Sequence, residues 1–238
     1  MSPLDAVLGA LVMGIGACLQ GAVGFGSNLF AAPLLLLLSD RFVPVPIVLA
    51  SLVLNLLVLR REGSASIDRR IHAATAGQLP GAVVAGVALT TLPERGLSIL
   101  FAVLVLTGVV LMGAGWHLRP SRPHLAGIGA ASAFMGTISG IGGPPIALAF
   151  QRADGPTLRG TLSRFFLVGG LISVATFAVV GRLGVDAVAP TVALLPGTLS
   201  GFALSAPVAR HLDRRSARPV VLALSALSAL AVLAREVL

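Results

Sequence analysis

The chain has 238 residues, of which 56% are hydrophobic and only 11% are charged, and its mean hydropathy is +0.97. A soluble domain carries about 25% charged residues, so this composition excludes a soluble surface and indicates an integral membrane protein. The net charge of +8 comes from arginines in short loops between apolar runs. Such placement is typical of a topology signal, and we expect no nucleic-acid partner.

Taken in chain order, the apolar runs predict helices at residues 4–23, 28–39, 43–59, 71–92, 97–117, 125–141, 143–150, 160–180, 187–209 and 218–234. Several runs reach the ~20 residues that cross a bilayer core as a helix, whereas 28–39 and 143–150 are too short to span. Period-2 alternation is missing, so the chain is predicted to be an all-α integral membrane protein and not a β-barrel.

A short pattern occurs twice in the chain, 116 positions apart. Gly24-Phe25-Gly26-Ser27-Asn28 corresponds to Gly140-Ile141-Gly142-Gly143-Pro144, and Leu79-Pro80-Gly81 corresponds to Leu195-Pro196-Gly197. Two unrelated landmarks with one offset indicate an internal duplication. We therefore expect an N-terminal transmembrane repeat in residues 1–118 and a C-terminal repeat in residues 119–238.

Arginine placement predicts how the two repeats cross the membrane. Four arginines, Arg41, Arg95, Arg182 and Arg235, lie in one set of loops and the other thirteen in the opposite set, which the positive-inside rule assigns to the cytoplasm. For this assignment to hold, each of the stretches 4–39 and 125–150 must enter and leave on one side. Each repeat is then a broken re-entrant helical hairpin plus three transmembrane helices. The repeats have inverted topology and both termini are periplasmic.

The glycine-rich breaks are the predicted substrate site, because broken helices at membrane depth mark the binding sites of many transporters. Gly24, Gly26, Gly140, Gly142 and Gly143 are expected to let the backbone reverse without a Cβ clash. Helices that restart near residues 27 and 143 would direct two N-termini, each carrying about +0.5 charge, toward one anion. Tight helix packing by small residues is the alternative role of these glycines.

Polar side chains beside the breaks could donate hydrogen bonds to an oxyanion. Gln20, Ser27 and Asn28 flank the first break, and Thr137 and Ser139 flank the second. Asn55, Gln78, Thr161 and Ser163 lie on later helices and could complete the pocket, although hydrogen bonding between helices is an equal alternative for each of them. Arg164 could hold the anion, or its side chain could extend to the cytoplasmic surface.

The ionisable residues argue against other functions. All nine acidic residues lie at helix ends or in loops, which disfavours cation substrates and proton-coupled carriers. The sequence contains no nucleophile–base pair, metal-ligand set or cofactor motif, so we expect neither an enzyme nor a bound metal or cofactor. A homodimer is compatible with so small a unit.

Two segments carry a family resemblance: Gly-Ala-Val-Gly-Phe-Gly-Ser at residues 21–27 and Gly-Thr-Ile-Ser-Gly-Ile-Gly-Gly-Pro-Pro at residues 136–145. Together with Leu-Arg-Gly-Thr-Leu at residues 158–162 and the Leu-Pro-Gly repeats, they resemble the sulfite exporter TauE/SafE family of bacterial permeases. The first segment departs from the pattern at Ser27-Asn28, where many members are richer in glycine.

The resemblance implies transport of small sulfur-containing anions, such as sulfite or organosulfonates, across a bacterial inner membrane. The expected function is therefore a secondary transporter, an exporter that works by alternating access between the two repeats. The alternatives are an anion channel on the same scaffold and a membrane structural protein that transports nothing.

Overall fold

The computed structural model describes residues 2–63, 67–114, 120–211 and 214–237, and the side chains of residues 210–221 and 235–237 are not described. Within these ranges the elements are α1 (Pro3–Val23), α2 (Ser27–Leu38), the 3-10 helix η1 (Asp40–Phe42), α3 (Val45–Glu62), α4 (Ile71–Thr91), α5 (Glu94–Gly113), α6 (Arg122–Ser139), α7 (Gly143–Phe150), α8 (Gly155–Val179), the 3-10 helix η3 (Val185–Ala187), α9 (Val188–His211) and α10 (Arg214–Val237). No strand occurs in the described residues, which confirms the all-α prediction.

The helix boundaries follow local capping chemistry. Ser2 and Asp5 form a reciprocal capping box at the start of α1, which satisfies two backbone N–H groups that have no partner inside the helix. At α8, the Asp154 carboxylate accepts from Thr157 N at 3.0 Å. This cap starts α8 at Gly155, earlier than the apolar run at residue 160 predicts.

Five helical stretches are long and apolar enough to cross a membrane, namely Pro3–Val23, Ile71–Thr91, Glu94–Gly113, Gly155–Val179 and Val185–Ala209. Their outward faces carry exposed large apolar side chains, such as Leu79, Val83 and Val87 on α4. A contiguous exposed apolar surface marks contact with a membrane or another protein. The short helix α7 differs from these long helices, because it buries every residue from Pro144 to Phe150.

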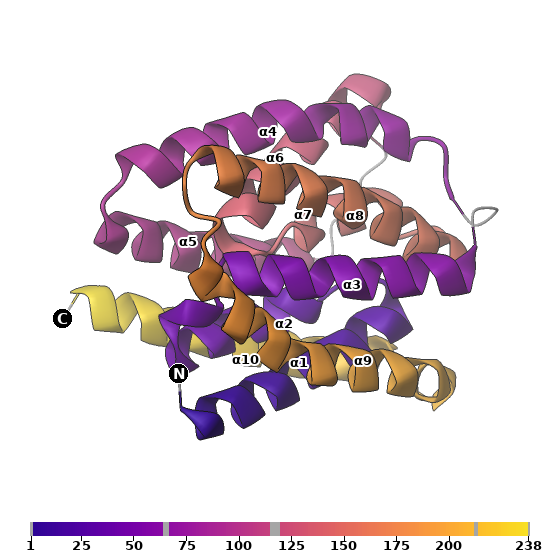
Figure 1. Cartoon of the computed structure of the whole chain (residues 1–238). Helices are drawn as coiled ribbons and strands as arrows, with labels where there is room; N and C mark the ends of the chain where they lie inside the picture. Colours follow the sequence, from indigo (N-terminus) through magenta and orange to yellow (C-terminus); the bar gives the residue numbers. More distant parts are fainter. Residues whose placement is uncertain (1, 64–66, 115–119, 212–213, 238) are drawn as a thin grey trace.

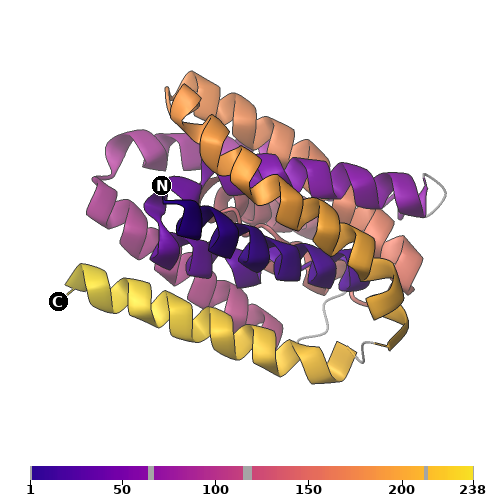
Figure 2. The same cartoon turned by 60° about the horizontal axis from the view of Figure 1, so that its bottom comes forward.

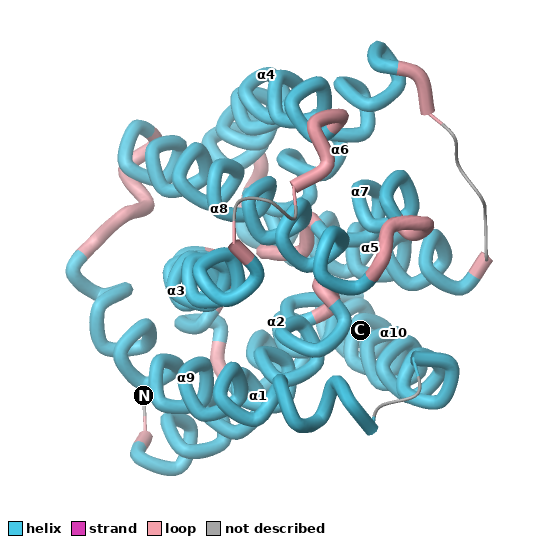
Figure 3. The backbone as a smooth tube through the Cα atoms, turned by 90° about the vertical axis from the view of Figure 1, so that its right-hand side faces the viewer, coloured by secondary structure: helices cyan, strands magenta, loops and turns pink. Residues whose placement is uncertain are grey.

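The helices pair in a pattern that repeats between the two halves. Figure 3 shows α1 beside α9 at one edge of the molecule and α4 beside α6 at the opposite edge, with α3 and α8 between them. At the offset of 116 residues, α1 corresponds to α6 and α4 to α9, so the two edge pairs are equivalent. The contacts of α2 with α10 and of α7 with α5 are equivalent in the same way.

Glycines of the Leu-Pro-Gly repeats bring the edge helices into backbone contact. A Cβ atom at Gly81 would lie 2.1 Å from the Ala130 carbonyl oxygen of α6, and a Cβ at Gly197 would lie 1.8 Å from the Ala10 oxygen of α1. No side chain fits at either position. Tight packing by small residues is therefore the role of these two glycines.

Both ends of the chain lie at one end of the helices, as Figures 1 and 2 show. The C-terminus of α3 and the N-terminus of α4 lie at the opposite end, where the backbone N–H of Asp68 donates to Thr161 Oγ1 at 2.9 Å. The arginine-based assignment of this end to the cytoplasm stays a prediction. Arg119 lies outside the described residues, and the side chains of Arg210, Arg214, Arg215, Arg218 and Arg235 are not described.

Candidate functional site

The first break separates α1 from α2 through two left-handed glycines. Gly24 has φ +103° and its N–H donates to the Gln20 carbonyl at 2.7 Å, which ends α1. Gly26 has φ +105° and is the N-cap of α2. L-residues with a side chain disfavour this backbone region, so the prediction that these glycines permit the break is confirmed.

The second break separates α6 from α7 and uses glycine differently. Gly140 has φ +74°, but Gly142 has φ −91° and Gly143 is not among the glycines with positive φ. At Gly142 the constraint is space, since a Cβ would lie 2.8 Å from the Ser132 carbonyl oxygen. At Gly143 a Cβ would meet nothing closer than 3.7 Å. The prediction that glycine is needed for the reversal is therefore wrong for Gly143.

A cavity of about 70 Å³ lies where the two breaks meet. It is lined by both breaks and by residues of α1, α3, α4, α6 and α8; its polar side chains are those of Gln20, Asn28, Ser51, Asn55, Gln78, Ser132 and Ser173. Its apolar wall includes three aromatic residues, Phe25, Phe165 and Phe166. No Asp, Glu, His or Arg lines this cavity in the part of the chain that the structure describes.

Asn28 joins the two breaks to each other. Its Nδ2 donates to the Gly140 carbonyl at 2.8 Å and to Ser51 Oγ at 2.9 Å. Its Oδ1 lies 3.0 Å from the Ser51 hydroxyl. Both amide hydrogens of Asn28 thus have protein acceptors. The side chain lines the cavity but mainly fixes the second break against α2 and α3.

A further pair of amides extends this arrangement along α3. Gln20 Nε2 donates to Asn55 Oδ1 at 2.8 Å, and Asn55 Nδ2 donates to the Ser51 carbonyl at 2.7 Å. Each amide keeps one N–H that these bonds do not use. Because Gln20 and Asn55 are 5% and 2% exposed, those hydrogens can reach only protein or a molecule in the cavity.

The restarting helices contribute unequally to the site. The first turn of α2 presents the N–H groups of Ser27, Asn28 and Leu29, while Phe30 N already donates to Gly26 O at 3.1 Å. In the first turn of α7, Pro144 and Pro145 carry no N–H, so Gly143 is its only donor. Both N-termini keep a partial positive charge, but α2 can make more hydrogen bonds to an anion.

The structure brings some of the predicted site residues together and separates others. Gln20, Gly26, Asn28, Gly140, Gly142 and Gly143 line the cavity, whereas Gly24, Ser27, Thr137, Ser139 and Arg164 do not.

Four of the residues outside the cavity have side chains with other surroundings. Ser27 Oγ packs toward Gly16 of α1. Thr137 is hydrogen-bonded to Ser173 at 2.8 Å, and Ser139 donates to Met135 O at 2.7 Å. The side chain of Arg164 is exposed.

Several lining residues were not predicted from the sequence. Asn55 and Gln78, for which the sequence allows either a pocket role or bonding between helices, line the cavity. Ser51, Ser132 and Ser173 line it too, and the sequence does not predict them. Ser51 and Asn55 are four residues apart, so they lie on one face of α3. That polar spacing inside an apolar run was the available signal.

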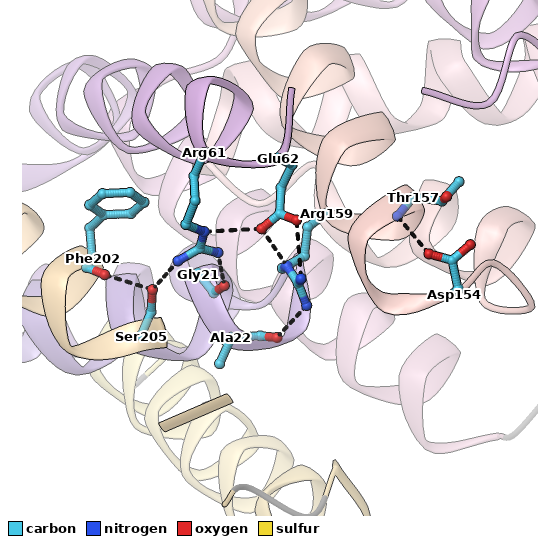
Figure 4. A network of polar contacts seen from close by, with 9 residues as sticks. All are labelled: Gly21, Ala22, Arg61, Glu62, Asp154, Thr157, Arg159, Phe202 and Ser205. Carbon is cyan, nitrogen blue, oxygen red and sulfur yellow. Dashed lines mark hydrogen bonds and ion pairs between the residues drawn. The ribbon is translucent and has the colours of Figure 1, made fainter. Parts of the chain in front are cut away.

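A network of charged groups lies beside the first break (Figure 4), at the C-terminus of α3, which Figure 1 shows away from the chain ends. Arg159 of α8 binds Glu62 of α3 through Nε at 2.7 Å and Nη2 at 3.1 Å. Arg61 donates to the same carboxylate at 3.0 Å and to Ser205 of α9 at 2.7 Å. The network therefore joins helices from both halves of the chain.

The same guanidinium groups bind the last carbonyls of α1. Arg61 Nη2 donates to the Gly21 oxygen, and Arg159 Nη1 donates to the Ala22 oxygen at 3.4 Å. Carbonyls at a helix C-terminus have no partner inside the helix and carry partial negative charge. Two cations therefore stabilise the end of α1 directly before the break at Gly24.

A family model for the sulfite exporter TauE/SafE matches residues 8–232. No curated protein and no solved structure matches the chain. The family match covers both breaks, both Leu-Pro-Gly repeats and most of the helices, and with the apolar helices it makes this a multi-pass membrane transporter. The chain belongs to the sulfite exporter TauE/SafE family.

Proposed function

We propose that the protein is a secondary transporter that exports small sulfur-containing anions, such as sulfite or short organosulfonates, across a bacterial inner membrane. The observation that carries this proposal is the cavity formed where the two broken helices meet. It combines two helix N-termini with uncharged hydrogen-bond donors. Such a site can bind an anion and release it again, because no fixed positive charge holds the anion there.

The size of the cavity supports a small substrate. One water needs about 10–15 Å³ of such space, so a volume of about 70 Å³ admits an anion of about four or five heavy atoms. Sulfite and methanesulfonate are of this size. A cavity of this volume also speaks against a purely structural membrane protein, whose interior would be filled by side chains.

The mechanism proposed is alternating access between two inverted-topology repeats, residues 1–118 and 119–238. Support comes from the equivalent pairing of α1 with α9 and of α4 with α6, and from the position of the cavity between the two halves. Rocking of one repeat against the other around a fixed site would open the cavity to each side in turn. With both chain ends periplasmic, the network of Arg61, Glu62 and Arg159 lies on the cytoplasmic side.

The test is uptake of labelled sulfite into proteoliposomes by the wild type and by Asn28→Leu. The substitution removes the bonds from α2 to Gly140 and Ser51, so the two breaks lose their registration and saturable flux should fall by at least tenfold. Thr107→Val is the control, since the Thr107 hydroxyl is exposed and bonds only within α5. No saturable sulfite flux above empty liposomes would refute the proposal.

An anion channel on the same scaffold is the competing function. A channel conducts without saturating at low substrate concentration and gives no counterflow. The equivalent pairing of α1 with α9 and of α4 with α6 favours the carrier, because alternating access needs two parts that can rock against each other. Accelerated exchange of labelled sulfite by unlabelled sulfite on the opposite side would identify a carrier.

A further inference from the structure

The cavity presents more hydrogen-bond donors than free acceptors, and this difference indicates which kind of ligand it can bind. Gln20 and Asn55 each keep a free amide hydrogen, and the first turn of α2 presents backbone N–H groups. Of the acceptors, Asn55 Oδ1 is occupied by Gln20 and the Gly140 carbonyl by Asn28, while the single Ser51 hydroxyl hydrogen serves either Asn28 Oδ1 or the Ile47 carbonyl. The cavity therefore offers several donors and few free acceptors.

Gln78 supplies an acceptor that has no partner. This side chain lines the cavity from α4 and is 1% exposed. Its Nε2 donates to the Phe165 carbonyl at 2.8 Å, which fixes the orientation of the amide because a carbonyl can only accept. Its Oε1 is then left without any hydrogen-bond partner. A buried acceptor without a donor is costly, and such a group calls for an explanation.

The room around the Gln78 amide is built into the neighbouring helix. Gly169 of α8 also lines the cavity, and a Cβ at this position would lie 2.7 Å from Gln78 Nε2. Any larger residue would push the amide away from Phe165. The bond to the Phe165 carbonyl thus holds the amide in place, and the missing side chain at Gly169 leaves room for it.

We infer that Gln78 selects the protonated monoanion of an oxyacid, a species with several acceptor oxygens and one O–H group. The oxygens of hydrogen sulfite would accept from the amide and backbone donors, and its hydroxyl would donate to Gln78 Oε1. The sulfite dianion has no proton to offer this oxygen and would face it with like partial charge. This inference rests on the proposed function and names the protonation state of its substrate.

No titratable side chain lines the cavity in the described residues, so the pH dependence of binding would come from the substrate. The charged or titratable groups on α4 and on the helices packed against it are His72, Arg122, His124, Arg159 and Arg164. None of them lines the cavity. The second ionisation of sulfurous acid occurs near neutral pH, so hydrogen sulfite and sulfite can be compared in one experiment.

The experiment measures the KM for sulfite in proteoliposomes at equal pH on both sides, from slightly acidic to clearly alkaline buffer. Methanesulfonate, which keeps one negative charge and has no O–H over this range, is tested as a competitor. In the wild type the KM expressed as total sulfite should rise tenfold per pH unit on the alkaline side. The inhibition constant of methanesulfonate should stay constant.

Two variants separate the acceptor from the donors. Gln78→Met keeps the side-chain length and removes the acceptor. It should therefore weaken the binding of hydrogen sulfite by about tenfold and leave the inhibition constant of methanesulfonate unchanged. Gln20→Met removes a donor and should weaken both anions to a similar extent. Melting temperatures in detergent show whether each variant is folded.

The outcomes are distinguishable. A total-sulfite KM that does not change with pH, or a Gln78→Met variant that weakens both anions equally, would overturn the inference and leave sulfite transport established. No saturable flux of sulfite at any pH would refute the proposed function, and the inference would fall with it. If methanesulfonate does not compete, the pH profile of the wild-type KM decides by itself.

Discussion

The contact between α1 and α9 depends on a glycine that admits no side chain, and this makes Gly197→Ala a sharp perturbation. The new Cβ would lie 1.8 Å from the Ala10 carbonyl oxygen, 2.7 Å from its carbonyl carbon and 3.0 Å from its Cα. Ordinary contact between heavy atoms needs about 3.5 Å. The obstacle is backbone inside a helix and cannot rotate away, so the two helices must separate by about 1.5 Å.

Separation on this scale opens the whole helix pair, because rigid helices move as units. Overpacking of this kind costs about 1–3 kcal/mol. The matched control is Gly127→Ala on α6, where a Cβ would meet nothing within 4 Å. Replacing a helical glycine with alanine stabilises by about 0.5–1 kcal/mol at either position, so the two variants should differ by the overpacking cost of about 1–3 kcal/mol.

The assay is thermal unfolding of the purified protein in detergent, with both variants beside the wild type. Gly197→Ala should melt several degrees below the wild type, at about 2–4 °C per kcal/mol, and Gly127→Ala at or above it. Gly81→Ala should repeat the loss, since its Cβ would lie 2.1 Å from the Ala130 oxygen in the equivalent helix pair. A Gly197→Ala variant as stable as Gly127→Ala would refute the close approach of α1 and α9.

Two further predictions concern the cavity and the charged network. Gly143→Ala should lower sulfite flux without loss of stability, because its methyl group would lie between the cavity-lining Phe25 and Phe166 at 3.7–3.8 Å and in permitted backbone; equal flux in reconstituted wild type and variant would contradict this. Glu62→Gln should lower the melting temperature, since two guanidinium groups lose their carboxylate and a hydrogen bond to a charged group is worth about 1.5–3 kcal/mol. Glu94→Gln is the control, because the Glu94 carboxylate is 85% exposed and such pairs contribute little; equal melting of the two variants would count against the network.

The glycine pattern was sufficient to locate both breaks. The backbone is left-handed at Gly24, Gly26 and Gly140, and glycine is the residue that adopts this conformation without steric cost. The role of each neighbouring polar residue could not be predicted in the same way. Ser27 and Asn28 are adjacent in sequence, but consecutive helix residues point about 100° apart. Asn28 therefore lines the cavity while Ser27 packs toward α1.

The serines that line the cavity could not be predicted from the sequence either. Ser51 and Ser132 lie inside apolar helices, where a hydroxyl can always bond to a carbonyl of its own helix. Ser51 does so, at 2.7 Å from the Ile47 oxygen, and also contacts Asn28. Hydroxyls with such a local partner are stable facing any direction, so only the packing of α3 and α6 decides which of them face the cavity.

The contacts beside the first break differ from those at the positions 116 residues away in the sequence. The positions equivalent to Arg61, Arg159 and Ser205, at the offset of 116 residues, are Phe177, Val43 and Leu89. The end beside the first break is held by Arg61, Glu62 and Arg159. At the equivalent end, Arg182 donates to the Leu89 carbonyl at 3.1 Å and pairs with Glu94 at 3.2 Å. We infer that the two sides open at different free-energy cost, because the Glu62 carboxylate is 8% exposed and the Glu94 carboxylate is 85% exposed, and exposed ion pairs contribute little to stability.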